Sequence, residues 1–294
     1  MPPEKYGQQH RIFVQGIMNA RVMDPKEMFN LYNISLRRTD IEAPKDPKEK
    51  TEALKRFIIC INKEFNKSQL DLEIVKVKDE ESEKQSGVMI LKSKKDSSEN
   101  DVEERLTSKA MVTFSTEELE YLKIIVQHIL LSDTKEITST FAVNRISDMK
   151  NSRKMTVQQA EVILHKFKEH YWLKFDDSNP NIRMTPRFIN EMGTFLEKMY
   201  KKLNPDDDKC SQIKCGICNE LVFQSVRCMI CNTNYHLYCV HKALDKSSNK
   251  KVKCKRCPDE YLPTTLYKPK VPEQSFNRKR SRYTQSDSES ESDE

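Results

Sequence analysis

Seven cysteines and one histidine in the last third of the chain have the spacing of metal ligands. From Cys215 the order is C-x2-C, nine residues, C-x2-C, four residues, His, two residues, Cys, fourteen residues and C-x2-C. Each C-x2-C pair can present two sulfurs to one ion at about 2.3 Å. Eight ligands suffice for two tetrahedral zinc sites. The predicted ligands are Cys215, Cys218, Cys228, Cys231, His236, Cys239, Cys254 and Cys257.

The eight ligands can pair sequentially or in an interleaved manner. Interleaving joins both ends of the segment 215–257 into one body, whereas sequential pairing leaves two very small lobes, so we favour interleaving. Four protein ligands then close each site, which is typical of structural rather than catalytic zinc. The interleaved sets are Cys215, Cys218, His236 and Cys239 for the first ion, and Cys228, Cys231, Cys254 and Cys257 for the second.

Two further residues compete for places in these sites. Cys210 lies outside the pattern and is expected to be a free thiol, although it could replace Cys215. His241 is the alternative to His236, and we favour His236 because its two-residue step to Cys239 suits a shared ion. The remaining cysteine, Cys60, stands alone in an apolar stretch and is expected to be a buried small hydrophobe.

Four cysteines, a histidine and three cysteines is the ligand order of PHD fingers and of variant RING domains. A PHD finger usually has a tryptophan two residues before its seventh ligand, where this chain has Val252. A RING domain contacts a ubiquitin-conjugating enzyme through an apolar residue between its first two ligands and a proline near the last pair. Ile217 and Pro258 occupy these positions and are predicted to make that contact, although Ile217 could instead be only a core residue of the module.

The basic residue that often follows the last RING cysteine is absent. Pro258 and Asp259 come directly after Cys257, so nothing stands at that position to clamp ubiquitin. Ligase activity is therefore expected to be weak or dependent on a partner.

The upstream sequence predicts two similar helical units that precede the module. In 8–92, helices are predicted over 10–21, from Pro25 and over 47–66, with strands at 70–77 and 87–91. In 109–202, two capping boxes open helices after Ser115 and Thr156, with a further helix over 139–149 between them. A hairpin at 171–175 and 181–184 and one helix over 186–200 complete this unit.

Three helices closed by a hairpin, present twice, is the order of winged-helix domains. The predicted fold is mainly α with small β-hairpins (α+β): tandem winged-helix domains at 8–92 and 109–202, then a cross-braced, two-zinc RING-like domain at 210–262. The alternative is two small helical domains without winged character. A charged linker is predicted at 93–108, and a disordered basic-then-acidic tail at 263–294.

Composition sets limits on the class of protein. The 294 residues are 33% charged and 36% hydrophobic, with only 5 Gly and 1 Trp, which favours helix-rich soluble modules over a large sheet or barrel. No run approaches the ~20 apolar residues that cross a bilayer, and the N-terminus lacks the apolar centre of a secretory signal. A reducing compartment is therefore expected, where clustered cysteines indicate metal rather than disulfides.

The formal charge of +6 is unevenly distributed. Residues 283–294 hold five acids and no lysine or arginine, so the rest of the chain is more basic than the total suggests. This surplus permits contact with DNA or acidic proteins. Residues 278–282 could be a nuclear import signal, although a solvated basic run is an equal alternative.

Two segments, KMTVQQAEVILHKFKEHYWL and KCGICNELVFQSVRCMICNTNYHLYC, together with the tandem winged helices, resemble the family of non-SMC element one subunits of the SMC five–six complex. The resemblance covers about residues 8–262. It implies a nuclear, chromosome-associated subunit that pairs through its winged helices with a MAGE-family subunit, together with a kleisin subunit. That trimer would bridge the heads of the SMC five–six heterodimer, which supports DNA repair by homologous recombination. The resemblance also implies RING-type ubiquitin ligase activity, stimulated by the MAGE partner.

Three functions remain open from the sequence. The chain could be a partner-activated ubiquitin ligase that works with a ubiquitin-conjugating enzyme. It could be a purely structural subunit whose zinc module stiffens an assembly. It could also read chromatin or DNA through its winged helices and basic body.

Overall fold

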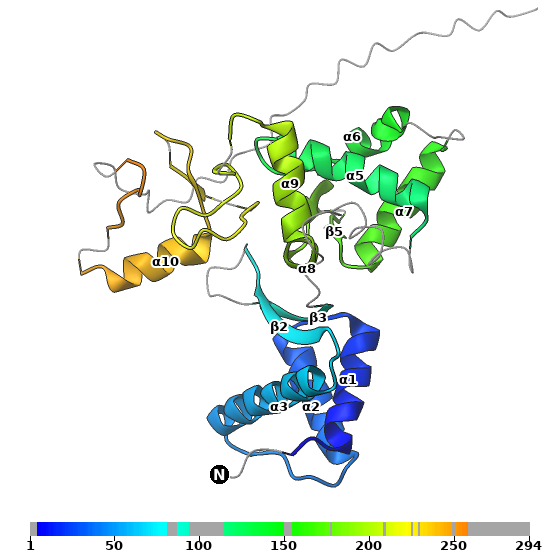
Figure 1. Cartoon of the computed structure of the whole chain (residues 1–294), viewed down its shortest axis with the longest axis vertical. Coiled ribbons are helices and arrows are strands. Elements are labelled where there is room, and N and C mark those ends of the chain that lie inside the picture. The colour runs from blue at the N-terminus through cyan, green and yellow to red at the C-terminus, as the bar shows by residue number, and fades with distance from the viewer. Residues whose placement is uncertain are drawn as a thin grey trace, which may run out of the picture.

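The computed structural model describes residues 5–80, 87–93, 114–149, 155–176, 178–207, 210–224, 226–228, 230–248 and 251–257. We divide them into the first unit (5–93), the second unit (114–207) and the cysteine-rich module (210–257) (Figure 1). Helices dominate both units, and the described strands form three small antiparallel sheets. The fold is therefore α+β, as predicted.

The first unit packs three helices against a three-stranded sheet of order β1-β3-β2. Asp24 and Asp46 cap the second and third helices by accepting bonds from first-turn N–H groups, and a proline follows each cap. The side chain of Asn62 bonds both backbone groups of Ile74, at 2.9 and 3.0 Å, and so fixes the hairpin on the third helix. The elements are α1 (Gln8–Ala20), β1 (Val22–Met23), α2 (Pro25–Arg37), α3 (Pro47–Lys67), β2 (Leu72–Lys78) and β3 (Gly87–Ser93).

An imidazole lies in the core of the first unit. His10 is fully buried and stacks on Phe57 with ring centroids 4.1 Å apart, while its Nδ1 accepts a hydrogen bond from the N–H of Gly7 at 3.0 Å. Burial lowers the pKa of His10 to about 4, because the charged form would lose its hydration. The side chain is therefore neutral at physiological pH.

This burial predicts a pH-dependent stability of the first unit. Between about pH 6.5 and about pH 4 the unfolded chain binds a proton at His10 that the folded unit does not, so the unfolding free energy should fall as pH is lowered through this window. Amide hydrogen exchange of α3, corrected for intrinsic rates, should show less protection at pH 5 than at pH 7. In His10→Gln, which can keep the cap, this loss should be smaller. An equal loss in both proteins would contradict the assignment.

The second unit repeats the order of helices and hairpin. Ser115 and Thr156 form the predicted capping boxes with Glu118 and Gln159. The buried hydroxyl of Tyr121 donates to the carbonyl of Ala142 at 3.0 Å, which joins two helices across the core. The elements are α5 (Thr116–Leu131), β4 (Ile137–Thr138), α6 (Ser139–Asn144), the 3-10 helix η1 (Arg145–Asp148), α7 (Val157–Glu169), β5 (Leu173–Lys174), β6 (Asn181–Met184), α8 (Pro186–Glu191) and α9 (Gly193–Leu203).

The structure departs from the predicted elements in three places. The sequence did not predict the two-residue strands β1 and β4, each of which adds a third strand to a hairpin. The helix predicted over 139–149 becomes 3-10 after Asn144. The single helix predicted over 186–200 is wrong: it breaks at Met192, which is buried and leaves the helical conformation (φ −112°, ψ 16°) just before Gly193.

The cysteine-rich module shares a core with the second unit. Cys210, Ile213 and Phe223 are at most 2% exposed and belong to the same apolar cluster as α5, α7 and α9. The β2–β3 hairpin of the first unit also reaches this junction and packs on α8 (Figure 1). The module's own elements are β7 (Val226–Arg227), β8 (Asn234–Tyr235) and α10 (Leu237–Lys246).

Several predictions fall outside the described residues. They are most of the linker at 93–108, the tail at 263–294 with its basic run, and the end of the module after Cys257. Among the described helices none combines the length and apolar character needed to span a membrane.

Candidate metal centre

The first cluster combines a cysteine knuckle with the start of α10. His236 directly precedes α10 and Cys239 lies in its first turn, while Cys215 and Cys218 come from the loop before β7. The Nδ1 atom of His236 lies 3.3 Å from Sγ of Cys218 and 3.8 Å from Sγ of Cys239. All four candidate ligand atoms lie within 4.8 Å of one another.

The second cluster joins the β7–β8 turn to the last described residues. It contains Cys228, Cys231, Cys254 and Cys257, whose sulfurs also lie within 4.8 Å of one another. Sγ of Cys231 lies 3.5 Å from Sγ of Cys254. The pairing is thus the interleaved one, because ligands of the second cluster lie between those of the first along the chain.

Both knuckles are shaped by an asparagine that follows the second cysteine. Asn219 and Asn232 have left-handed φ angles of 62° and 53°, which asparagine tolerates better than most residues. Each donates its N–H to the carbonyl of the knuckle's first cysteine, at 2.8 and 3.0 Å. Gly216 packs so closely on Tyr235 that a Cβ at this position would lie only 2.6 Å from the ring, which leaves no room for a side chain. These turns place the two sulfurs of each knuckle beside the other candidate ligands of its cluster.

The donor sets fit tetrahedral zinc. Zinc–sulfur bonds of about 2.3 Å give a tetrahedral edge of about 3.8 Å, and the separations above are close to that value. Backbone N–H groups point at the sulfurs, as a thiolate requires: those of Ile217 and His236 approach Sγ of Cys215, each at 3.4 Å. Four protein donors per cluster leave no open position, so the arrangement suits structural ions rather than catalytic ones.

The cysteines of the first cluster differ in how readily they lose a proton. A hydrogen bond from Cys239 lowers the pKa of Cys215 to about 3 and raises that of Cys239. Burial lowers the pKa of His236, but bonds with Cys215 and Glu80 outweigh this effect and raise it to about 10. Without a metal, the cluster at neutral pH therefore pairs a Cys215 thiolate with a protonated His236, and a bound zinc ion would displace the imidazole proton.

A carboxylate of the first unit reaches this cluster, and no sequence pattern indicated it. Glu80, at the end of the β2 arm, is 7% exposed, and its Oε2 accepts the N–H groups of Phe223 and Gln224 at 3.0 and 2.6 Å. Its Oε1 lies 3.6 Å from Nε2 of His236, the nitrogen that faces away from the cysteines and also lies 2.9 Å from the carbonyl of Leu221. Such partners orient a histidine ligand.

The remaining site predictions have different outcomes. His241 belongs to neither cluster, and Cys210 is buried against α9, where its thiol lies 3.9 Å from the carbonyl of Glu197. Cys60 is buried in α3 at 9% exposure. Ile217 is half-buried between the first two cysteines and packs against the module core, and Pro258 lies outside the described residues.

Known proteins resemble both the sequence and the fold. A family model described as "Nse1 non-SMC component of SMC5-6 complex" matches residues 10–192. Proteins called "Non-structural maintenance of chromosomes element 1 homolog" are similar to the chain. The human one is 31% identical over 164 residues, which is 56% of each chain. The Bos taurus one is 31% identical over 152 residues, which is 52% of each.

The chain spans about half the length of the curated relatives it matches. A solved structure described as "Nse1-Nse3-Nse4 complex" has a chain that superposes with a TM-score of 0.69 and 22% identity. The superposition covers 90% of this chain and 100% of that one. At this identity the likeness shows the fold alone.

Proposed function

The chain belongs to the family of Nse1 non-SMC components of the SMC5-6 complex, and from this premise we propose that it is a subunit of that complex with a zinc-dependent, RING-type ubiquitin ligase module. The observation that carries the proposal is the pair of closed, interleaved four-residue clusters. Such a module works by holding a conjugating enzyme and its ubiquitin thioester in a reactive arrangement. Its two zinc ions would be structural.

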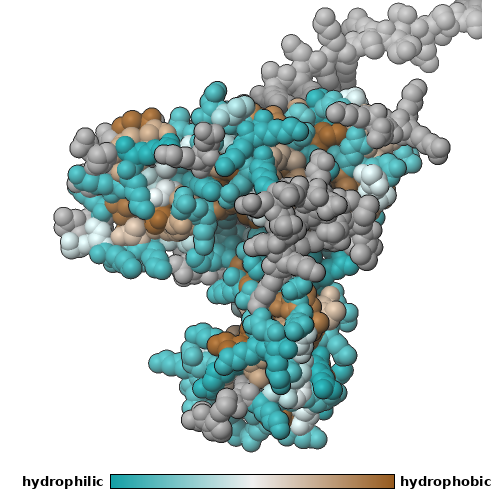
Figure 2. All heavy atoms as spheres, viewed as in Figure 1, coloured by the Kyte–Doolittle hydropathy of each residue, from teal (hydrophilic) through white to brown (hydrophobic). Residues whose placement is uncertain are grey.

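The surface of the module suits a protein partner. Figure 2 shows a mainly hydrophilic molecule with separate hydrophobic patches, some of them over the module at the left. Ile217 lies on the first knuckle, where its carbonyl accepts a bond from Lys255 at 3.1 Å. We propose that Ile217, together with Pro258, contacts the conjugating enzyme. The sequence lacks the basic clamp after Cys257, so the proposed activity depends on a partner.

Truncating Ile217 should separate catalysis from folding. We expect ubiquitin discharge from a charged conjugating enzyme to be slow with the chain alone and faster with its MAGE-family partner. Ile217→Ala should lower the stimulated rate about tenfold, the effect of losing about 1.4 kcal/mol of contact, with zinc content unchanged. The measurement is the decay of the thioester in single-turnover gels.

Ile230 offers a matched control. It is an isoleucine in the second C-x2-C knuckle and is 60% exposed, so Ile230→Ala makes the same chemical change away from the proposed contact. This variant should discharge ubiquitin like the parent. Absence of discharge across a panel of conjugating enzymes, with both zinc ions bound, would refute the ligase proposal and leave the zinc module standing.

The proposed partners follow from the family and from the solved complex. We propose that the two units are winged-helix domains and that they pair with a MAGE-family subunit, together with a kleisin subunit. The name of the solved structure, which contains Nse1, Nse3 and Nse4, supports a three-subunit assembly. In this proposal the assembly joins the SMC five–six heterodimer, acts in DNA repair by homologous recombination and is located on chromosomes in the nucleus.

A structural role for the module is the second candidate. Its support is that Ile213 and Phe223 lie in the core of the second unit and that Glu80 of the first unit bonds the module. A module that contacts both units in this way can stiffen an assembly without having ligase activity. Loss of complex assembly in a zinc-free variant, with no discharge by the parent, would favour this role.

A further inference from the structure

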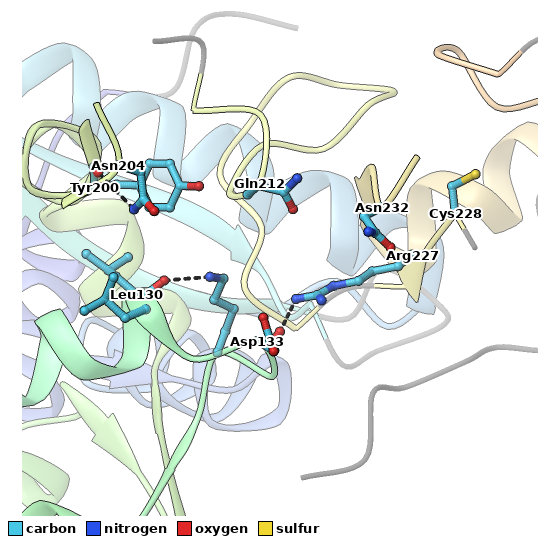
Figure 3. Close-up of a pocket in the computed structure, with 10 residues that line it drawn as sticks. Leu130, Asp133, Tyr200, Asn204, Gln212, Arg227, Cys228 and Asn232 are labelled. Carbon is cyan, nitrogen blue, oxygen red and sulfur yellow. Dashed lines mark hydrogen bonds between the residues drawn. The ribbon is translucent and has the colours of Figure 1, made fainter. Parts of the chain in front are cut away.

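A polar pocket separates the second unit from the cysteine-rich module. Its volume is about 620 Å³, and we call it the Lys135 pocket. Figure 3 shows residues of the second unit on one side and of the module on the other, with Gln212 between them. The lining residues are Leu130, Leu131, Asp133, Lys135, Tyr200, Asn204, Gln212, Arg227, Cys228 and Asn232.

The ammonium group of Lys135 is buried here, and no carboxylate among the described residues pairs with it. Lys135 is 7% exposed and has a left-handed backbone with φ 57°. Its Nζ donates to the carbonyl of Leu130 at 2.6 Å and lies 5.8 Å from the ring centroid of Tyr200. The bond to Leu130 stabilises the end of α5, but it uses only one of three donors. A buried charge with open donors is costly unless a partner completes its shell.

A second cation enters the pocket from the module. Arg227 donates its Nε to Oδ1 of Asn234 at 2.9 Å and its Nη2 to the carbonyl of Asp133. Within the described part of the chain, neither Arg227 nor Lys135 forms an ion pair. Two cations from different parts of the fold therefore face one pocket, and the oxygens that accept their hydrogen bonds there are neutral.

The local charges do not cancel this positive field. Burial, with a smaller contribution from the charge of Arg227, lowers the pKa of Lys135 to about 8 against a still smaller opposite effect of Asp133. Asp133 is exposed, so water screens its charge. In Figure 3 the sulfur of Cys228 points away from the guanidinium of Arg227, so the thiolate is not directed into the pocket.

We propose that the Lys135 pocket binds a phosphoryl monoester dianion between Nζ of Lys135 and the guanidinium of Arg227. Two unpaired cations match two negative charges, and the side-chain amide of Gln212 adds a donor. A terminal phosphoryl group can enter far enough to reach the buried Nζ, whereas a phosphodiester carries a substituent on each side. Free phosphate and a phosphorylated side chain share this chemistry. A bound anion would also join the second unit to the module.

The proposal is tested with the zinc-loaded chain of 294 residues. Titration calorimetry would compare inorganic phosphate, O-phosphoserine and acetate with sodium chloride at equal ionic strength. We expect phosphate and phosphoserine to bind and to raise the thermal unfolding midpoint, with acetate at least about tenfold weaker because it carries one charge and two oxygens. Tighter binding of phosphoserine would identify a phosphorylated side chain as the source, and equal binding would identify free phosphate.

Variants from both sides of the pocket make the test specific. Lys135→Gln and Arg227→Gln should each weaken phosphate binding at least about tenfold, the loss of one charge-assisted bond. Lys242→Gln removes an exposed lysine of the module and should change nothing. If Lys135→Gln does not fold, Arg227→Gln decides alone. The proposal is overturned if phosphate gives no heat beyond chloride, if the charge variants bind phosphate like the parent, or if acetate binds as tightly as phosphate.

Discussion

Cys215→Ser should reduce the zinc content from two ions per chain to one at most and unfold the cysteine-rich module. Serine keeps the shape of cysteine but is a poor zinc ligand, so the first cluster loses a donor that also accepts two backbone N–H groups. A structural zinc site contributes about 10–16 kcal/mol to the folded state, which is comparable to the whole stability of a domain. The measurement is metal content by mass spectrometry, with circular dichroism for folding.

Apart from its contacts with the two units, the module has only a small core of its own. This apolar cluster is built around the ligands themselves, and its other buried members are Val222, Val226, Tyr235, Tyr238 and Val240. Because the ligands interleave, disorder at Cys215 also releases the segment that carries Cys228 and Cys231. We therefore expect the second ion to be held more weakly in this variant, and a chelator to remove it at lower concentration.

Cys210→Ser is the matched control for this experiment. It makes the same substitution five residues upstream, in a buried cysteine that belongs to neither cluster. Burial of a hydroxyl there can lower stability by about 1–3 kcal/mol, but both zinc ions should remain. Two ions bound by Cys215→Ser with an intact spectrum would show that the cluster is not a zinc site.

Glu80→Gln should weaken zinc binding at the first cluster about 10–100-fold, the usual effect of removing a carboxylate that supports a histidine ligand. The amide can still accept the N–H groups of Phe223 and Gln224, but it presents no negative charge to Nε2 of His236. Glu80→Ala should weaken zinc binding more than Glu80→Gln does. It leaves two backbone donors without their acceptor, at about 1–3 kcal/mol each.

Competition with a chelator of known affinity measures this effect, and limited proteolysis between the first unit and the module reports whether they stay docked. Glu73→Gln is the control, because Glu73 lies in β2, the strand that leads to Glu80, and has no bond to the module among the described contacts. Equal chelator midpoints in Glu80→Gln, Glu73→Gln and the parent would show that Glu80 does not support the metal site.

Local signals account for most of what the sequence could predict. The spacing from Cys215 to Cys257 restricts which residues can share an ion, and the structure brings together the sets chosen on that ground. The starts of several helices could also be predicted from the sequence, because Asp24, Ser115 and Thr156 cap their helices through bonds to residues two or three positions away. The family resemblance is confirmed by the match over residues 10–192.

The missed features depend on contacts between distant residues. β1 and β4 are too short to carry an alternating pattern and exist because a hairpin edge far along the chain pairs with them. Glu80 stands in a polar stretch, DEESEKQS, that reads as a solvated loop. Its bonds to Phe223 and Gln224 span 143 and 144 residues, and no local pattern encodes such a contact. Lys135 and Arg227 meet for the same reason.

The long reach of Glu80 also orders events during synthesis. The first unit leaves the ribosome with the Glu80 carboxylate in water, and the first of the two N–H groups that donate to it follows 143 residues later. The interleaved clusters are complete only once Cys257 has emerged. Closing so long a loop before the module forms would cost chain entropy without a bonded partner. We therefore expect docking of the first unit on the module to be the final step of folding. A ribosome stalled after the second unit but before Cys257 would carry two folded units that lack the hydrogen bonds of Glu80.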